Sequence, residues 1–370
     1  MIFHMTSKKP VLLIGNGARE SGALESIYKL RDKTHIPVLT SLNTVDMMQD
    51  EDRIGFIGTY GNRAANMIVA ESDFIIAVGI RLGLRQIGHK KELFAPKAGL
   101  IRADIDQAEL SRQIKKDEEK YLIDAKEFIN KLLKEKVPDY TEWNAKCLKL
   151  RDRLEGHDDT LGNRVIKKIG LMLPENPIVA VDIGQAMCWT AQSLALRGRY
   201  GRIMIGGSYG AMGVGLPYAI GASIANEKGK VFCITGDGGL QMNIQELETI
   251  VRENLPIKIL VINNHVLGKI SEVQEKSYNH RFAQTTKESG YSVPHFENIA
   301  KAYGMKATTL NSYEELGRYS DWFEDQESCL IDITIPWDTK LIPKIEFDTM
   351  EVMPRLENSF ADEIAEILQF

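Results

Sequence analysis

The sequence predicts an α/β protein built from two doubly wound domains, each with a parallel β-sheet. Short apolar runs rich in β-branched residues alternate with helical patterns along nearly the whole chain. This alternation is typical of parallel strands joined by crossover helices. The chain has 370 residues, which is enough for more than one domain. A charged stretch at residues 116–155 separates two sets of apolar runs, so we place a domain boundary there.

The first domain is predicted over residues 1–135. Each strand is a short apolar run that stops at a glycine, a proline or a polar cluster. The predicted strands are 11–14, 36–40, 73–79 and 100–106, and the predicted helices are 17–29 and 62–71. Residues 136–160, which are charged and contain Pro138, are predicted to be a linker of exposed helix and coil.

The second domain is predicted over residues 161–338. It opens with a helix at 164–173, and a run of small residues predicts another helix at 211–225. The predicted strands are 178–182, 231–235, 257–263 and 329–335. Residues 339–370 are predicted to be a C-terminal tail that is irregular at first and ends in a short helix.

Composition and charge exclude several classes of protein. The net charge of −5 argues against a nucleic-acid surface, because phosphate binding needs a basic face. No apolar run approaches the roughly 18–20 residues of a membrane span, and residues 1–10 show no leader peptide. We therefore expect a cytoplasmic protein with reduced thiols, since no pair of its cysteines has zinc-ligand spacing. The cysteines are Cys147, Cys188, Cys233 and Cys329.

One motif indicates a binding site for phosphate and a metal ion. An apolar strand runs into residues 236–239, Gly-Asp-Gly-Gly, and the next strand ends in Asn263-Asn264. Glycines at a strand end let backbone N–H groups approach phosphate oxygens. A carboxylate beside them can bind phosphate only through a divalent cation, and Mg²⁺ prefers such oxygen ligands. We expect Mg²⁺ to be held by Asp237, the side-chain oxygen of Asn264 and the backbone carbonyl of Val266.

The same residues have a simpler interpretation. Gly-Asp-Gly alone can be a turn, and Asn-Asn can be a helix cap. The two motifs occur together, however, with 24 residues between them. This arrangement resembles the diphosphate–metal signature of thiamine-diphosphate (ThDP) enzymes. The resemblance implies that ThDP binds here together with Mg²⁺.

Neighbouring segments extend the resemblance. Residues 206–217 are similar to the family's segment before the Gly-Asp-Gly motif, where the backbone of two residues contacts the aminopyrimidine ring. Residues 184–187 look like the loop over the diphosphate. Met242 occupies the place of the apolar side chain that holds the cofactor in a V shape, although by itself it would be a core residue. The implied cofactor-binding residues are Gly184, Gln185, Ala186, Gly210, Met212, Gly236, Asp237, Gly238, Gly239, Met242, Asn264, Val266 and Gly268.

The first domain resembles the central domain of acetolactate synthases. The similarity lies in residues 61–66, 79–82 and 103–106. In some relatives this domain binds FAD and in others it binds nothing, and the sequence leaves FAD open as an alternative. Residues 15–17 do not complete a dinucleotide fingerprint, because Glu20 replaces the third glycine. Three arginines could contact a nucleotide or form surface ion pairs: Arg63, Arg81 and Arg85.

The chain is most similar to acetolactate-synthase-like proteins of surface-polysaccharide gene clusters. This resemblance rests on residues 81–86, 236–256 and 288–294 and covers about residues 8–338. It implies a lyase or transferase that decarboxylates a small 2-oxo acid and transfers the acyl group. It also implies a homo-oligomer, since the family's sites form between subunits.

The catalytic residue is unknown at this stage. In the family, a glutamate of an N-terminal pyrimidine-binding domain activates the cofactor, and no glutamate in this chain matches it. We expect that domain to come from a partner or from a missing N-terminal domain. The alternative is a non-catalytic ThDP-binding or structural subunit. Lys269 and three histidines could face a substrate or solvent; the histidines are His265, His280 and His295.

Overall fold

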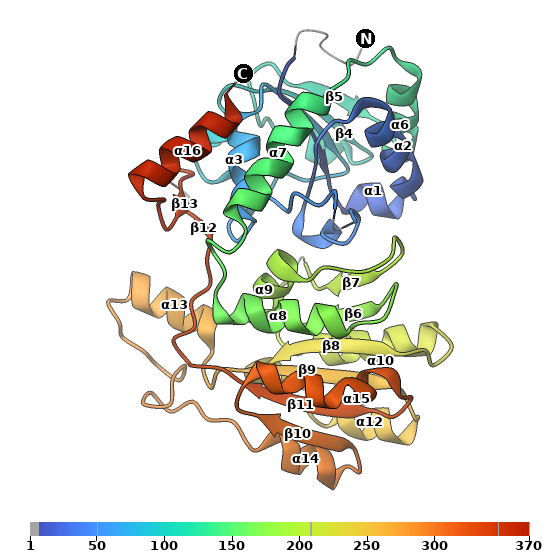
Figure 1. Ribbon diagram of the computed structural model, residues 1–370, viewed down its shortest axis with the longest axis vertical. Helices are drawn as coiled ribbons and strands as arrows, with labels where there is room; N and C mark the ends of the chain where they lie inside the picture. Colours follow the sequence, from blue (N-terminus) through green and yellow to red (C-terminus); the bar gives the residue numbers. More distant parts are fainter. Residues whose placement is uncertain (1–6, 50, 208, 347, 370) are drawn as a thin grey trace. The chain divides into compact units, whose positions relative to one another are not determined.

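The structure is a computed structural model that describes residues 7–49, 51–207, 209–346 and 348–369. The chain forms two compact units, one built from residues up to Asp158 and from Ile342 onward, the other from Asp159 to Leu341. Each unit has one large parallel sheet with helices on both faces (Figure 1). The predicted architecture of two α/β domains is therefore confirmed. Residues 1–6 and Ser208, on which parts of the sequence analysis rest, lie outside the described residues.

The first unit contains a five-stranded sheet with the order β2-β1-β3-β4-β5. Its strands are β1 Pro10–Ile14, β2 Val38–Thr40, β3 Phe74–Val78, β4 Gly99–Asp104 and β5 Glu119–Leu122. Its helices are α1 Asn16–Glu20, α2 Leu24–Thr34, η1 Leu42–Thr44, α3 Arg63–Glu71, α4 Leu84–Ile87, η2 Lys91–Leu93, α5 Gln107–Ser111, α6 Ala125–Lys134, α7 Thr141–Leu154 and α16 Asn358–Leu368. A two-stranded antiparallel ribbon joins β12 Lys344–Ile345 to β13 Val352–Met353.

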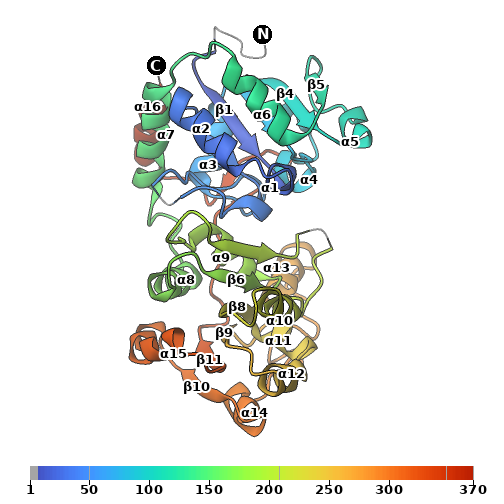
Figure 2. The same cartoon turned by 90° about the vertical axis from the view of Figure 1, so that its right-hand side faces the viewer.

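Alternation along the strands builds a core on each face of this sheet, because successive side chains point to opposite faces. Val11 and Leu13 pack into one core with α3, α7 and α16. Leu12 and Ile14 pack into the other core with α2 and α6. Figures 1 and 2 show these two groups of helices on opposite sides of the sheet.

The predicted linker and tail contain packed helices. Within 136–160, α7 buries Trp143, Cys147 and Leu150 in the core of the first unit. These residues recur at helical spacing, so one side of a mostly charged segment is apolar. The indole N–H of Trp143 also donates to the carbonyl of Pro10 at 3.0 Å. Within 339–370, α16 buries Ile364 in the same core, so both segments belong to the first unit.

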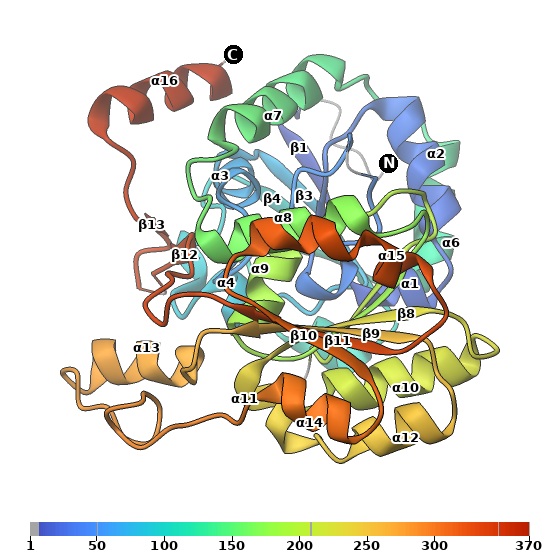
Figure 3. The ribbon, with the colours of Figure 1, turned by 60° about the horizontal axis from the view of Figure 1, so that its bottom comes forward.

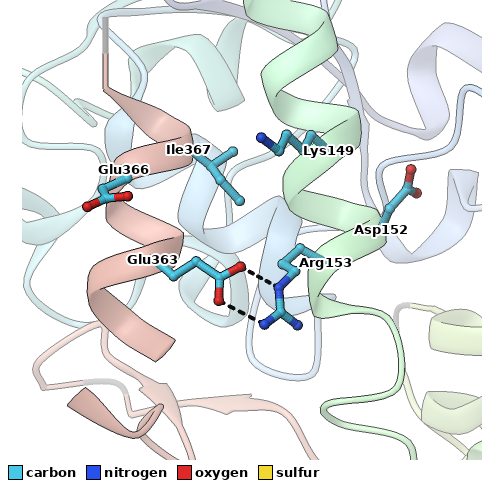
Figure 4. A pocket seen from close by; sticks show the side chains of 6 residues that line it. All are labelled: Lys149, Asp152, Arg153, Glu363, Glu366 and Ile367. Atoms are coloured by element: carbon cyan, nitrogen blue, oxygen red, sulfur yellow. Dashed lines mark hydrogen bonds and ion pairs between the residues drawn. The ribbon is translucent and has the colours of Figure 1, made fainter. Parts of the chain in front are cut away.

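A shallow pocket lies between α7 and α16 (Figure 4). The guanidinium of Arg153 donates to both carboxylate oxygens of Glu363, at 2.5 and 2.8 Å. It also lies over the ring of Phe360, 4.5 Å from its centroid. Because Arg153 and Glu363 already pair with each other, we interpret the pocket as part of the contact between two packed helices. Its lining residues are Lys149, Asp152, Arg153, Glu363, Glu366 and Ile367.

The second unit contains a six-stranded parallel sheet with the order β10-β11-β9-β8-β6-β7. Its strands are β6 Ile178–Val181, β7 Arg202–Ile205, β8 Val231–Gly236, β9 Ile257–Asn263, β10 Lys306–Leu310 and β11 Cys329–Thr334. Its helices are α8 Leu161–Met172, α9 Gln185–Ser193, α10 Gly215–Ala225, α11 Asp237–Met242, α12 Glu246–Arg252, α13 Gly268–Ser277, α14 Phe296–Ala302, η3 Tyr313–Tyr319 and α15 Ser320–Glu324. Figure 3 shows α8 and α15 on one face of the sheet and α10, α12 and α14 on the other.

The strand order creates a switch point in this sheet. From β6 the chain moves outward to the edge strand β7, then returns to the other side of β6 to form β8. The connections that follow β6 and β8 therefore leave in opposite directions. In open α/β sheets, ligands bind at such a point, outside the carboxyl ends of the strands.

Two expectations from composition can be compared with the described residues. Among them, every helix is too short or too polar to cross a membrane. The four cysteines are free and buried, and burial raises the pKa of the Cys233 and Cys329 thiols. Such thiols remain protonated and unreactive at neutral pH.

Candidate functional site

The predicted motif lies at the switch point. β8 ends at Gly236, and Asp237 begins α11 directly after it. Parallel pairing of β8 with β9 places Gly236 beside Ile262, so the Asn263-Asn264 pair emerges from the same edge as Asp237. The loop at Gly184 follows β6, the strand on the other side of β8. Three neighbouring strand ends thus bring the predicted segments together.

Asp237 is buried without adequate partners. Its side chain is only 3% exposed, and its Oδ2 atom accepts no hydrogen bond from the described residues. Burial raises the pKa of Asp237 to about 7, although the nearby Gly238 amide and Tyr291 hydroxyl lower it. A buried carboxylate oxygen that lacks a partner is costly, so a cation at Oδ2 would satisfy it.

The two asparagines after β9 have different surroundings. The side-chain oxygen of Asn263 accepts from the His265 amide at 3.1 Å, and its amide nitrogen donates to Asp332 at 3.3 Å. Asn263 therefore shapes the turn, in which His265 has a left-handed φ of 53°. The Asn264 amide nitrogen donates to the Gln185 side chain at 2.8 Å, which leaves the Asn264 side-chain oxygen for another ligand.

Gln185 and Gly268 lie in contact beside Asn264. A Cβ atom on Gly268 would come within 1.9 Å of the Gln185 side-chain oxygen. A side chain at this position would therefore displace the Gln185 side chain from its hydrogen bond with Asn264. Gly184, with a φ of 116°, precedes α9, and Ala186 lies in its first turn. The structure thus joins the loop after β6 to the loop after β9.

The two predicted methionines also lie at this edge. A Cβ atom on Gly238 would be 3.3 Å from the Met212 side chain, and one on Gly213 would be 2.6 Å from Cβ of Met242. Met212 is 39% exposed and Met242 is 58% exposed, so neither is a core residue. Both side chains remain accessible to a ligand. Gly210 has a φ of 63° and approaches Ile183.

The remaining predicted residues have local partners. The Val266 carbonyl accepts from the Gly268 amide at 2.9 Å, and its second lone pair remains for a cation. Lys269 forms an ion pair with Glu272 at 2.9 Å. Burial, Lys287 and His295 lower the pKa of His265. Among the described residues, no group of three or more His, Cys, Asp or Glu side chains could hold a metal, so a cation here would need amide and carbonyl ligands.

Asp182 is the residue that the sequence analysis missed. It follows β6, is 1% exposed, and accepts from the amides of Ile183 (2.7 Å) and Gly213 (3.0 Å). The Thr235 hydroxyl donates to its other oxygen at 3.2 Å. Burial raises the pKa of Asp182, and these hydrogen bonds oppose that rise. Asp182 therefore ties the segment that carries Met212 to the end of β8.

We expect the Asp182→Ala variant to lose about 3 kcal/mol in free energy of unfolding, because it leaves the buried Ile183 and Gly213 amides without this acceptor. The Asp182→Asn variant keeps one acceptor oxygen and should lose about 1 kcal/mol. Urea denaturation of the two variants and the wild type measures both values. Equal losses in the two variants would contradict this role for the carboxylate.

Two of the three candidate arginines of the first unit, Arg63 and Arg81, have internal partners, whereas Arg85 is exposed. Arg63 is buried and donates to both carboxylate oxygens of Asp158, at 2.8 and 2.7 Å. Arg81 pairs with Glu109 at 2.6 Å. The amides of Gly15 and Gly17, which a dinucleotide phosphate would need, donate to the carbonyls of Val78 and Gly79. These residues therefore offer few free groups to a nucleotide.

Two family models match the chain. The family model described as "Thiamine pyrophosphate enzyme, central domain" matches residues 5–132. The model described as "Thiamine pyrophosphate enzyme, C-terminal TPP binding domain" matches residues 182–333. Thiamine pyrophosphate (TPP) is another name for ThDP. The two matched ranges fall in the first and second units, respectively.

Individual relatives are similar over most of the chain. The acetolactate synthase large subunit of Pyropia yezoensis is 33% identical over 84% of this chain and 54% of its own length. That of Lactococcus lactis is 32% identical over 92% of this chain and 60% of its own length. The probable acetolactate synthase large subunit of Methanocaldococcus jannaschii is 31% identical, over 98% and 64%. The chain thus spans less than two thirds of these relatives.

Proposed function

The chain belongs to the thiamine pyrophosphate enzymes, of which it carries the central and C-terminal domains, and on this basis we propose that its second unit binds ThDP through Mg²⁺. We further propose that it is a component of an acetolactate-synthase-like decarboxylase and carboligase. Its donor substrate would be a small 2-oxo acid. The relatives named acetolactate synthase support this assignment.

The observation that carries the proposal is the unpartnered, buried Oδ2 atom of Asp237 at the sheet's switch point. Asp237, the Asn264 side-chain oxygen and the Val266 carbonyl would hold Mg²⁺, which accepts hard oxygen ligands. Backbone amides near Gly184 and residues 236–239 would contact the diphosphate. Bound ThDP supplies a nucleophilic carbon that adds to the carbonyl of a 2-oxo acid.

Activation of the cofactor needs a glutamate, and we propose that it lies outside residues 1–370, in a pyrimidine-binding domain. That domain could be part of a longer chain or of a separate protein. The exposed Met212 and Met242 support a site that is completed by another polypeptide. A homo-oligomer and a cytoplasmic location are parts of the same proposal. FAD is not, because Arg63 and Arg81 are already paired.

The second candidate is a non-catalytic ThDP-binding subunit. Such a subunit would hold the cofactor at the same site but would never receive an activating glutamate. An assay of pyruvate decarboxylation distinguishes the two functions. Activity that appears only when a pyrimidine-domain protein is added supports the enzyme component, and its absence with bound cofactor supports the alternative.

A calorimetric titration of the purified chain with ThDP in the presence of Mg²⁺ tests cofactor binding. We expect saturable binding that chelation of Mg²⁺ with EDTA abolishes, because the diphosphate and Asp237 repel one another without a cation. Binding that persists in excess EDTA would contradict the proposed metal bridge.

The Met242→Ala variant should distinguish the end of the site that binds the cofactor's rings from the end that binds its diphosphate. Met242 is more than half exposed, so its truncation should cost less than about 1 kcal/mol in free energy of unfolding. We expect ThDP affinity to fall about tenfold, while affinity for inorganic diphosphate with Mg²⁺ stays unchanged, since a buried apolar contact of this size contributes roughly 1.5 kcal/mol. Equal losses for both ligands would argue against a contact with the rings.

A further inference from the structure

Tyr291 is a polar side chain to which the proposed function gives no role. It lies between α13 and α14, and its hydroxyl is buried without a hydrogen-bond partner among the described residues. A buried hydroxyl in this condition destabilises the fold. Such a group indicates either a loss of stability without benefit or a ligand that the hydroxyl contacts.

The hydroxyl is directed at the candidate cation site. A Cβ atom on Gly238 would lie 3.1 Å from the Tyr291 hydroxyl oxygen. Burial and the nearby Asp237 carboxylate both raise the pKa of Tyr291. The unpartnered Oδ2 atom of Asp237 lies in the same place. The buried hydroxyl and the buried carboxylate therefore interact with each other, but neither the Tyr291 hydroxyl nor Oδ2 of Asp237 has a hydrogen bond of normal length to the described residues.

The segment that carries Tyr291 is fixed by its own hydrogen bonds. The Tyr291 amide donates to the Thr286 carbonyl at 2.9 Å, and the Ser289 hydroxyl accepts from the Thr286 amide at 2.9 Å. The Leu267 amide donates to the Thr285 carbonyl at 2.9 Å. This last bond ties the segment to the loop that follows Asn264. The backbone that carries Tyr291 is therefore held in place before any ligand arrives.

We propose that the Tyr291 hydroxyl is a positioning group for the Mg²⁺–diphosphate pair, to which it donates a hydrogen bond at an oxygen bound to the cation. This inference rests on the proposed function. Asp237 can only accept, so it would face the cation, and the hydroxyl can donate, so it would face an anionic oxygen. A hydrogen bond to a charged oxygen is among the stronger ones.

The test compares Tyr291→Phe with the matched variant Tyr303→Phe in the full chain. Tyr303 is another tyrosine of the same unit and packs against its core. Tyr303→Phe likewise removes a single hydroxyl. Calorimetry should show about tenfold weaker binding of ThDP with Mg²⁺ for Tyr291→Phe, and the same loss for inorganic diphosphate with Mg²⁺. Tyr303→Phe should bind as the wild type does. Without ligand, Tyr291→Phe should melt at the wild-type temperature or above it, because it removes an unsatisfied group.

Each contrary result overturns a defined part of this inference. Wild-type affinity in Tyr291→Phe, while Asp237→Ala fails to bind, would reject the role of Tyr291 and leave the proposed function intact. A lower melting temperature of ligand-free Tyr291→Phe would show that the hydroxyl serves the fold. A wild type that binds neither ligand at millimolar concentration would overturn the proposed function and this inference with it.

Discussion

Replacing Asp237 with alanine is expected to weaken binding of ThDP with Mg²⁺ by at least about a hundredfold. The carboxylate is the only charged oxygen among the proposed metal ligands, and a lost buried charge pair costs about 3–5 kcal/mol. Asp237→Asn retains the size of the side chain and should lose nearly as much, because the negative charge bridges diphosphate and protein through the cation. Calorimetric titration of the two variants measures both dissociation constants.

Two comparisons make this result specific. Asp321→Ala removes an exposed carboxylate on α15, and we expect it to bind as the wild type does. Asp237→Ala should remain folded, although the Gly238 amide and the Tyr291 hydroxyl lose the carboxylate as a partner. Its urea midpoint should lie close to that of the wild type, because removal of the unpartnered Oδ2 atom offsets that loss. Unchanged cofactor affinity in Asp237→Ala would reject the site.

Replacing Asp325 with alanine is expected to reduce stability about as much as replacing Asp182. The ammonium of Lys258 is 0% exposed within β9, and it donates to the Asp325 carboxylate and the Glu327 carbonyl. Asp325 itself is 30% exposed. We expect a loss of about 2–3 kcal/mol, because the variant leaves a buried charge unpaired while solvent screens part of the interaction. Urea denaturation measures this loss.

Matched variants distinguish the contribution of the buried Lys258 charge to stability from that of the exposed Lys306 charge. Lys258→Met removes the buried ammonium and should cost less than about 1 kcal/mol, since apolar replacements of buried ion pairs are often neutral. Lys306→Ala removes an exposed ammonium that also pairs with Asp325, and it should leave the urea midpoint nearly unchanged, because solvent screens this pair. A loss in Lys306→Ala equal to that in Asp325→Ala would contradict this division.

The ion pairs of Asp325 also predict how the stability of the fold depends on pH. Burial alone would raise the pKa of Asp325, but its bonds to Lys258 and Lys306 lower it to about 2. Because the folded pKa lies below the ordinary value of about 3.9, the carboxylate stabilises the fold at higher pH. This stability should disappear as the pH falls from about 4 toward 2. Asp325→Ala should lack that part of the acid transition.

The central strands and the chemical motif could be predicted from the sequence alone. The runs at 231–235 and 257–263 are continuous and apolar, and they became the buried strands β8 and β9. The spacing of Gly-Asp-Gly from Asn-Asn indicated two neighbouring strand ends, and the structure places both at one edge of the sheet. These patterns are local, so a single stretch of sequence contains all the information that they need.

Three of the four edge strands of the two large sheets could not be predicted in the same way. The analysis missed β5, β7 and β10, of which β5 is mostly exposed and β10 mixes exposed and buried residues. Each lies at an edge or next to the outside of its sheet, where fewer side chains are buried and the apolar pattern weakens. The placement of α7 and α16 in one core depends on contacts between segments more than 200 residues apart.

The sequence by itself thus determined the fold class, the family and the segments that meet at the candidate site. Only the tertiary structure decided which side chain does what within it. It separated Asn263, which shapes the turn, from Asn264, which faces the site. It also brought Asp182 to Gly213 and Thr235, 31 and 53 residues away. Hydrogen bonds and burial depend on which distant chain segments come into contact, and the spacing of residues along the sequence does not show these contacts.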